Sequence, residues 1–409
     1  MKKERMVFVT NLHFSPNGNG GQQRTYFLIK ELSLNFDLIV ISPYKANEPE
    51  IKDVNADFIE NKGVLARKWM QQSFLGRLVT KLATILLKLK SSHSNPVKYY
   101  SSLQLVKQIK NIKKDKRYNN AEIIVFDTVR TVEKLNKSLF KKRILNAHNF
   151  DSEIYEYELE QLKNKNVSPV GILDKSRELK FVQSFEHHID SYFDVIWTCS
   201  NEDIKKFKEH NPKTNVKFEC LPNGSDTESR KLQKINHNYQ KLLFVGSLNY
   251  FPNVNGLRWF VKSILSKVPN DFELTIVGKS PKAEDFDFIK PFANIKLIGE
   301  VDDVEPYYAL NDVVVVPLLE GSGTRLKIME AFSYGKLVLS TAKGMEGISA
   351  VDGKHYIQFE DFNDFETKYL VDLKNGTFES LRKQARLLVE NHYSWKGIVS
   401  DYSKKLYGT

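Results

Sequence analysis

Short apolar runs alternate with polar stretches of helical length, and this alternation occurs twice along the chain. Before residue 220 the strand-like runs are RMVFVTNL, FDLIVISP, AEIIVFDT, KKRILNAH and FDVIWTCS. After residue 240 the runs are KLLFVGSL, FELTIVG, NIKLIGEV, DVVVVPLL and KLVLST. Buried strands joined by helices are typical of parallel sheets covered on both faces. The pattern therefore predicts an α/β chain with two doubly wound, Rossmann-like domains.

The length of the chain and a break in the pattern predict the domain boundaries. The chain has 409 residues, and a domain usually holds roughly 100 to 200 residues. The stretch 227–240 is polar and contains no apolar run long enough for a strand, which predicts a linker. We expect an N-terminal domain at 1–226, a C-terminal domain at 241–390, and a helix at 391–409 that packs back on the first domain. Ligands bind at the carboxyl ends of parallel strands, so we expect a site where the two domains face each other across a cleft.

The formal net charge of +11 favours an anionic partner, which can be nucleic acid, anionic lipid or a phosphorylated substrate. Nucleic acid is the least favoured of the three, because the sequence has no zinc-ligand spacing and no RNA-binding aromatic signature. Cys199 and Cys220 provide no disulfide framework, which predicts a reducing, cytoplasmic location. The first apolar run is too short for a signal peptide and fits a first strand.

A basic stretch at 66–90, ARKWMQQSFLGRLVTKLATILLKLK, alternates cations with apolar side chains. Its most apolar part, 78–89, is interrupted by Lys81 and Lys88 and falls short of the ~20 apolar residues needed to span a membrane. Two interpretations stay open. The stretch can lie on an anionic membrane as a peripheral contact at the inner face of the cell membrane, or it can be a domain helix with a solvated basic face.

The loop FSPNGNGGQQRTYF follows the first strand and is rich in glycine. Gly20 and Gly21 allow a ligand to approach the backbone, and the helix that follows favours a phosphate or a polar sugar. Arg24 adds a cation beside them. The dinucleotide fingerprint is incomplete, because Gln23 stands where its third glycine would be. The alternative is that these glycines only turn the chain.

His148 follows the strand-like run at 143–147, in the loop NAHNFDSEIY. A histidine at the carboxyl end of a strand in such a sheet is placed to meet a substrate. A hydrogen-bonded structural histidine is the competing interpretation. Adjacent His187 and His188 point about 100° apart on a helix, so they are a poor chelate, and no metal site is expected.

The stretch EGSGTRLKIMEAF at 320–332 places a glycine-rich turn immediately before a helix. Backbone amides at the beginning of a helix lack partners and attract anions, which makes this turn a candidate phosphate site. Arg325 and Lys327 are unfavourable near that positive helix end unless an anion binds there. An ordinary surface pair between Lys327 and Glu330 is the alternative. The candidate binding residues in the turn are Gly321, Ser322, Gly323 and Thr324.

Taken together, these loops resemble a glycosyltransferase of the GT-B architecture. The chain is most similar to the retaining family 4 enzymes and, within them, to the group 1 sugar transferases of bacterial polysaccharide assembly. The most specific segments are LLFVGSLNYFPNVNGLRWF and GEVDDVEPYYALNDVVVVPLLEGSGTRLKIMEAFSYGKLVLSTAKGMEGI, while GGQQR, HNFDS and LPNG match more weakly. The resemblance implies a nucleotide diphosphate sugar as donor and a glycan, lipid-linked or protein-linked acceptor. It also implies transfer with retention, without a metal or a cofactor, in the assembly of cell-surface polysaccharide or glycoconjugate.

The same resemblance implies roles for the candidate residues. Gly20 and Gly21 would approach the donor diphosphate or the acceptor, and His148 would face the reacting sugar. Glu330 would hold the ribose hydroxyls, since a carboxylate can accept two hydrogen bonds from a vicinal diol. The nucleotide would also contact the loops at Gly246 and Gly299, and the leaving diphosphate would be stabilised by Arg325 and Lys327.

The chain departs from the family pattern at two places. Many members carry a second glutamate eight positions before the ribose-binding one, where this chain has Ser322, and Glu320 lies two positions too early to replace it. Many members also place an arginine and a lysine in the loop after Gly246, where this chain has SLN. These departures keep two alternatives open, a GT-B nucleotide-sugar epimerase and a catalytically silent partner of another glycosyltransferase.

Overall fold

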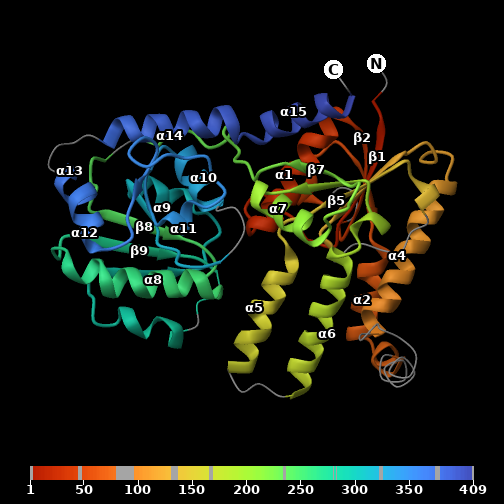
Figure 1. The fold of residues 1–409 in the computed structure, drawn as a ribbon, viewed down its shortest axis with the longest axis horizontal. Helices are drawn as coiled ribbons and strands as arrows, with labels where there is room; N and C mark the ends of the chain where they lie inside the picture. The colour runs from red at the N-terminus through yellow and green to blue at the C-terminus, as the bar shows by residue number, and fades with distance from the viewer. Residues whose placement is uncertain are drawn as a thin grey trace. The chain divides into compact units, whose positions relative to one another are not determined.

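A computed structural model describes residues 3–44, 48–79, 96–129, 137–164, 169–233, 236–279, 281, 283–321, 326–373 and 378–407. The chain divides into two compact units, Met1–Leu221 and Pro222–Thr409. Each unit is built on a parallel sheet flanked by helices (Figure 1). The predicted α/β class with two doubly wound sheets is confirmed.

The sheet of the first unit has seven parallel strands in the order β3-β2-β1-β4-β5-β6-β7. Its strands are β1 (Arg5–Val9), β2 (Asp37–Ser42), β3 (Asp57–Glu60), β4 (Ile123–Asp127), β5 (Lys142–Asn146), β6 (Val195–Thr198) and β7 (Lys217–Cys220). Five of them coincide with the apolar runs. The other two, β3 and β7, form the edges of the sheet and are only partly buried. An edge strand needs few buried side chains, so the sequences of β3 and β7 contain no continuous apolar run. The alternation of apolar and polar stretches therefore did not predict these two strands.

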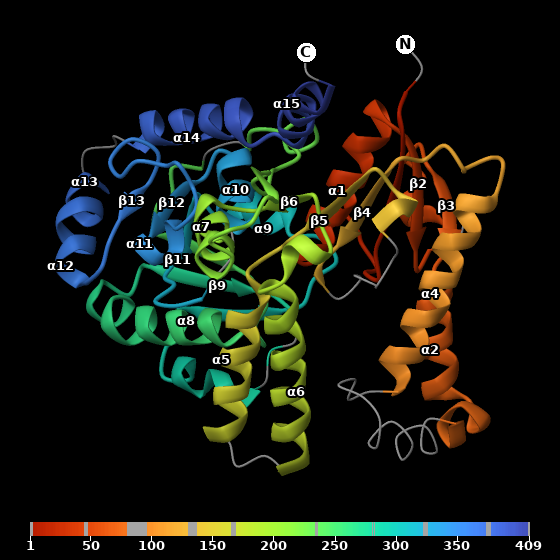
Figure 2. The same cartoon turned by 45° about the vertical axis from the view of Figure 1, so that its right-hand side comes forward.

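The longer helices of the first unit include two pairs that lie side by side, α2 with α4 and α5 with α6 (Figure 2). The charged sequence at 159–192 predicts a helical stretch. The structure has two helices there, and the first of them begins at Asp151. The helices are α1 (Gly20–Asn35), α2 (Lys62–Gln72), α4 (Pro96–Lys114), α5 (Asp151–Asn164), α6 (Pro169–Glu186) and α7 (Asn201–His210). Short 3₁₀ turns lie at Pro49–Ile51, Lys137–Leu139 and Ile189–Ser191.

The sheet of the second unit has six parallel strands in the order β10-β9-β8-β11-β12-β13. Its strands are β8 (Lys241–Val245), β9 (Glu273–Val277), β10 (Ile295–Gly299), β11 (Val313–Val316), β12 (Leu337–Ser340) and β13 (Ile357–Gln358). Successive residues of a strand point to opposite sides of the sheet, and both sides of this sheet are buried. Val313 and Val315 pack in the core that contains Leu257, whereas Val314 and Val316 pack in the core that contains Ile328.

Helices cover both faces of this second sheet. The helices of the second unit are α8 (Phe251–Ser263), α9 (Glu305–Leu310), α10 (Leu326–Ser333), α11 (Ala342–Met345), α12 (Phe362–Phe365), α13 (Val371–Leu373), α14 (Phe378–His392) and α15 (Trp395–Tyr407). Further turns are Leu265–Lys267, Ala283–Ile289 and the π-helical Glu366–Leu370. Helix α15 belongs to the second unit, and its packing on the first domain stays a prediction. No helix among the described residues is both long and apolar enough to cross a membrane, and the part of the stretch 78–89 from residue 80 onward lies outside them.

Both sheets contain the strand order 3-2-1-4-5-6 of doubly wound folds. The order reverses between β1 and β4 in the first unit and between β8 and β11 in the second. Ligands of such sheets bind outside the carboxyl ends of the strands at this switch point. The loops after β1, β4, β8 and β11 are therefore the places to look for a site in each unit.

Candidate active site

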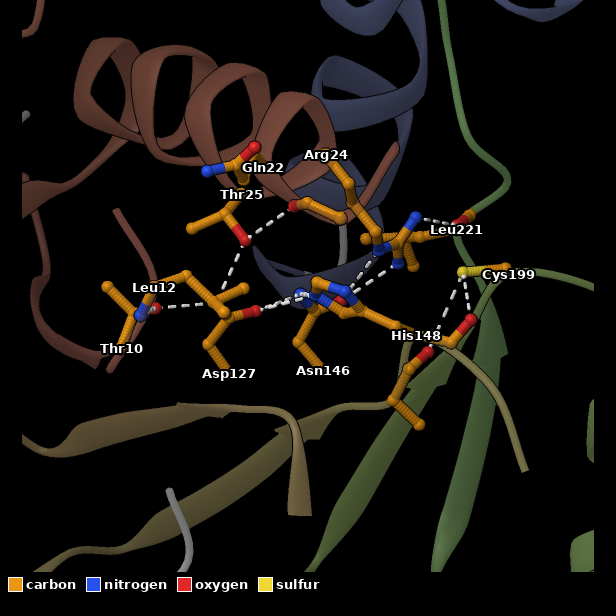
Figure 3. Close-up of polar contacts among 12 residues, drawn as sticks. Thr10, Leu12, Gln22, Arg24, Thr25, Asp127, Asn146, His148, Cys199 and Leu221 are labelled. Carbon is orange, nitrogen blue, oxygen red and sulfur yellow. Dashed lines mark hydrogen bonds and ion pairs between the residues drawn. The ribbon is translucent and has the colours of Figure 1, made fainter. Parts of the chain in front are cut away.

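A buried polar network surrounds Asp127 at the switch point of the first unit (Figure 3). Asp127 is the last residue of β4 and is fully buried. Its Oδ2 accepts hydrogen bonds from the hydroxyls of Thr10 (2.7 Å) and Thr25 (2.9 Å). Its Oδ1 accepts one from Asn146 Nδ2 (2.8 Å) and lies 2.8 Å from His148 Nε2. The first strand, the first helix and the histidine loop thus converge on one carboxylate.

The Asp127 carboxyl is ionised within this network. Burial by itself would raise its pKa, but the adjacent His148 and the hydrogen bonds from Thr10 and Asn146 outweigh burial and lower the pKa below its usual value. An ionised carboxylate can only accept hydrogen bonds, so His148 Nε2 carries the proton that it donates to Asp127. The imidazole is fixed by this bond, and its other nitrogen, Nδ1, is the one that can meet a ligand.

His148 Nδ1 lies against the first turn of α1. A Cβ atom placed on Gly21 would be 3.1 Å from it, which is tighter than most van der Waals contacts. Gly20 is the first residue of α1, and Asn19 and Gln22 close this helix end reciprocally, with Asn19 Oδ1 accepting from Gln22 N (3.1 Å) and Gln22 Oε1 from Asn19 N (2.9 Å). The structure therefore brings the loop that contains Gly20 and Gly21 close to the loop that contains His148.

Arg24 lies behind this network and is 1% exposed. Its guanidinium donates to Asn146 Oδ1 from two nitrogens (3.1 and 2.8 Å) and to the Leu221 carbonyl (2.8 Å). It orients the amide that in turn donates to Asp127, so the structure assigns it a supporting position. Cys199 supports the same loop, because its thiol donates to the His148 carbonyl (3.2 Å) and burial raises its pKa to about 12.

In the second unit, glycines allow the carboxyl ends of β8 and β9 to pack closely. Gly246 follows β8, and a Cβ there would be 2.7 Å from Lys327 Nζ and 3.0 Å from Asn253 Nδ2. A Cβ on Gly278, after β9, would overlap the Gly246 carbonyl oxygen. Lys327 Nζ donates to Asn253 Oδ1 (2.8 Å) and lies 4.4 Å from the centre of the Phe244 ring. The ammonium group of α10 is thus held at the end of β8, on the switch point.

The turn before α10 is described as far as Gly321. This residue has φ = +100°, a conformation that favours glycine, and a Cβ there would be 3.1 Å from the Tyr250 hydroxyl. Gly299, at the end of β10, also has a positive φ of +86°. Glu320 Oε1 accepts a hydrogen bond from Asn255 Nδ2 (2.9 Å), which directs it to α8. The predicted roles of Ser322, Gly323, Thr324 and Arg325 fall outside the described residues and stay predictions.

Glu330 lies on α10 with its side chain 12% exposed. Its Oε1 accepts from the Arg230 guanidinium (2.7 Å) and its Oε2 from the Tyr308 hydroxyl (3.2 Å). Arg230 belongs to the segment between the two sheets, and because this segment has no periodic pattern, Arg230 could not be singled out from the sequence. Among the residues that the structure describes, no three His, Cys, Asp or Glu side chains gather closely enough to hold a metal ion.

Two units, each built on a doubly wound parallel sheet, are the architecture of the GT-B fold. Residues 239–375 match the family model described as Glycosyl transferases group 1. The second unit therefore contains a group 1 glycosyltransferase domain.

Known proteins resemble this chain in sequence or in fold. A relative described as an uncharacterized 44.6 kDa protein in the cps region of Klebsiella pneumoniae is 23% identical over 310 residues, which cover 73% of this chain and 76% of that protein. One similar solved structure is sucrose-phosphate synthase from Thermosynechococcus elongatus, with a TM-score of 0.68 and 13% identity over 99% of this chain and 100% of that chain. Anabaena HepE with UDP-glucose has a TM-score of 0.62 and 10% identity over 99% of this chain and 100% of that chain. WaaG, a glycosyltransferase involved in lipopolysaccharide biosynthesis, has a TM-score of 0.61 and 15% identity over 99% of this chain and 100% of that chain. At these identities the solved structures show the shared fold.

Proposed function

We propose that this glycosyltransferase takes its sugar from a nucleotide diphosphate sugar bound by the unit Pro222–Thr409. The observation that carries the proposal is the arrangement of α10, which presents Lys327 at the end of β8 and Glu330 one helical turn further on. A cation suits a diphosphate and a carboxylate suits a ribose diol. The HepE structure, which contains UDP-glucose, has the same fold and supports this class of donor.

The chemistry follows from the charge that develops during transfer. When the bond between the sugar and the diphosphate breaks, negative charge grows on the leaving diphosphate. A prearranged cation lowers the barrier because it requires little reorganisation at that moment, and removing one such group typically costs ~10²-fold or more in rate. Lys327 fills this role, together with Arg325 and the backbone amides of Gly321–Thr324.

The reacting sugar is proposed to meet His148. The bond to Asp127 fixes the ring, so that Nδ1 can accept a hydrogen bond from a sugar hydroxyl near Gly21. We infer transfer with retention and without a metal, in which the leaving phosphate accepts the proton of the attacking hydroxyl on the same face of the sugar. The acceptor is a glycan, a lipid-linked sugar or a protein, in the assembly of cell-surface polysaccharide or glycoconjugate, consistent with the similarity to WaaG.

Contact with the inner face of the membrane is proposed for the region of α2 and the residues that follow it. Trp69, Phe74 and Leu75 are 44%, 76% and 63% exposed. The cationic Lys68 and Arg77 lie beside them in the sequence and are exposed as well. Apolar side chains next to cations suit an interface rich in anionic lipid, where a lipid-linked acceptor would be found.

A turnover assay with the variant Lys327→Met tests the donor site. The enzyme is first screened by thermal shift against nucleotide sugars and free nucleotides, and release of nucleotide from the selected donor is then measured. Lys327→Met is expected to lower turnover by ~10²-fold or more. Lys343→Met, which removes a half-exposed lysine paired with Glu346, should leave turnover unchanged. Unchanged turnover in Lys327→Met would refute the assignment, an isomeric nucleotide sugar as product would indicate an epimerase, and absence of turnover in the unmodified enzyme would indicate a silent partner.

A further inference from the structure

The segment that leads from β7 to β8 reaches into the proposed nucleotide site through Arg230. The Arg230 guanidinium donates to Glu330 Oε1 (2.7 Å) and to the Ser225 hydroxyl (2.9 Å). The two charged side chains are 11% and 12% exposed. An arginine from an irregular segment is thus buried against the carboxylate that we propose to bind ribose.

The backbone that carries Arg230 is itself anchored to α14. Arg386 donates to the carbonyls of Arg230 (2.8 Å) and Thr227 (3.0 Å). Arg386 also donates to the Ser333 carbonyl at the end of α10, and Ser333 donates to the Ser225 hydroxyl (2.8 Å). Segment and helix are therefore fixed to each other, so the position of the Arg230 guanidinium is well defined.

The contacts of Glu330 fix its side chain without saturating it. A carboxylate has roughly four lone-pair positions, and Arg230 and the Tyr308 hydroxyl each use one. Tyr308 is fully buried and stacks on Tyr334 at 4.7 Å, so it offers a rigid second support. Two positions are left for the two hydroxyls of a ribose.

Arg230 also provides charge compensation. Removing one partner of a buried ion pair leaves an uncompensated charge, which is strongly unfavourable. Lys327 lies three residues before Glu330 on α10, a spacing at which side chains meet. Without Arg230, the Glu330 carboxylate would be drawn toward Lys327, and the cation proposed for the diphosphate would be diverted.

We propose that Arg230 is a positioning residue for the nucleotide, which holds Glu330 in the orientation that accepts the 2′ and 3′ hydroxyls of ribose. This inference rests on the proposed function of Glu330 and Lys327. It assigns a role in donor binding to a segment outside the secondary structure of the nucleotide-binding sheet.

Calorimetric titration with paired nucleotides tests the proposal. UDP, GDP, ADP and CDP are titrated into the unmodified enzyme, and the tightest ligand is compared with its 2′-deoxy form. A hydrogen bond to a charged group is lost in the deoxy ligand, so its Kd should be ~10-fold higher or more. In Arg230→Met the Kd of the ribonucleotide should rise ~10-fold, and the ratio of the two Kd values should fall to about 2 or less.

Control variants separate positioning from a general structural effect. Lys231→Met removes an exposed cation from the next position in the chain and should leave both Kd values unchanged. Tyr308→Phe removes only the second hydrogen bond to Glu330 and should lower the ratio partially, which keeps the test decisive if Arg230→Met does not fold. A purely structural role for Arg230 would weaken both ligands equally and leave their ratio intact, and that result would overturn the inference.

Failure of the inference and failure of the proposed function give different results. If the unmodified enzyme binds a ribonucleotide and its 2′-deoxy form equally well, Glu330 does not bind the ribose hydroxyls. The role of Arg230 is then overturned, while the proposed donor class stands. If the unmodified enzyme binds none of the four nucleotides, the proposed donor class fails and the inference fails with it.

Discussion

Replacement of Asp127 by asparagine removes the charge that holds His148 while it keeps the shape of the side chain. Four donors point at the carboxylate, from Thr10 and Thr25 to Oδ2 and from Asn146 and His148 to Oδ1. Asparagine offers one oxygen and one amide group. Whichever way the amide turns, two of the four donors face an N–H group instead of an acceptor.

The cost follows from these contacts. A hydrogen bond to a charged group contributes about 1.5–3 kcal/mol, and a buried donor without an acceptor costs about 1–3 kcal/mol. The hydroxyls can rotate toward other acceptors, but the imidazole and the Asn146 amide have less freedom. We expect the free energy of unfolding to fall by about 3 kcal/mol, which is a large part of a typical stability of about 5–15 kcal/mol.

The catalytic effect should be larger than the effect on stability alone implies. If the asparagine amide faces His148, the ring must turn or change its tautomer, and Nδ1 no longer presents an acceptor to the sugar. A well-placed proton-transfer or hydrogen-bonding group contributes ~10²–10⁴-fold, so kcat should fall at least 10²-fold. The Kd for free nucleotide should stay within about 2-fold, because the nucleotide is assigned to the other unit.

The matched control is Asp312→Asn. Asp312 is also fully buried, lies 3.5 Å from Lys336 Nζ and accepts from the backbone of Asn236 and Asn238. It precedes β11 and therefore lies at the opposite end of its sheet from the switch point. Urea unfolding and steady-state kinetics should show a stability loss in both variants and a loss of kcat only in Asp127→Asn. A folded Asp127→Asn enzyme with kcat within 3-fold of the unmodified enzyme would refute this account of His148.

Three further predictions concern other parts of the chain. Gly246→Ala would push Lys327 Nζ, which is only 2.7 Å from the new Cβ; because a flexible side chain can move, titration should show weaker nucleotide binding with little change in the unfolding temperature. Burial raises the pKa of Glu186 from 4.5 to about 7, so its contribution to stability, on the order of 3 kcal/mol, is present below pH 4.5 and is lost as the pH rises through 7. Urea unfolding from pH 4.5 to 7.5 should show this decline, and Glu186→Gln should remove it. Replacing both Trp69 and Phe74 by glutamate should abolish sedimentation with anionic vesicles at low salt, and absence of sedimentation by the unmodified enzyme would remove the membrane proposal.

The sequence predicts the two sheets well because their inner strands are buried on both sides and read as continuous apolar runs. β3 and β7 could not be recognised in this way, since edge strands need only one partly buried face. The division of the helical stretch into α5 and α6 was missed as well. Its polar, weakly periodic sequence gives few signals for the point at which a helix ends.

The candidate site is predictable only where a residue directly follows an apolar run. His148 and Gly246 satisfy that condition, and their places at strand ends agree with it. Asp127 also ends a strand, but its pairing with His148 depends on β4 and β5 being neighbours. Consecutive strands are adjacent in most sheets, so this contact was within reach of topological reasoning. Arg230 was not, because nothing in an irregular segment indicates which side chain turns inward.

The two switch points differ in their charge, and this difference favours a different kind of ligand at each. In the first unit the ionised Asp127 and the buried Arg24 are joined through the Asn146 amide, which accepts from one and donates to the other. Their charges compensate, so this end of the sheet suits a neutral sugar or hydroxyl better than a diphosphate. In the second unit a cation on α10 donates to the neutral amide of Asn253 at the equivalent end of the sheet. The same strand order thus provides a hydrogen-bonding site in one unit and an anion site in the other, and we infer that Gly20 and Gly21 meet the acceptor rather than the diphosphate.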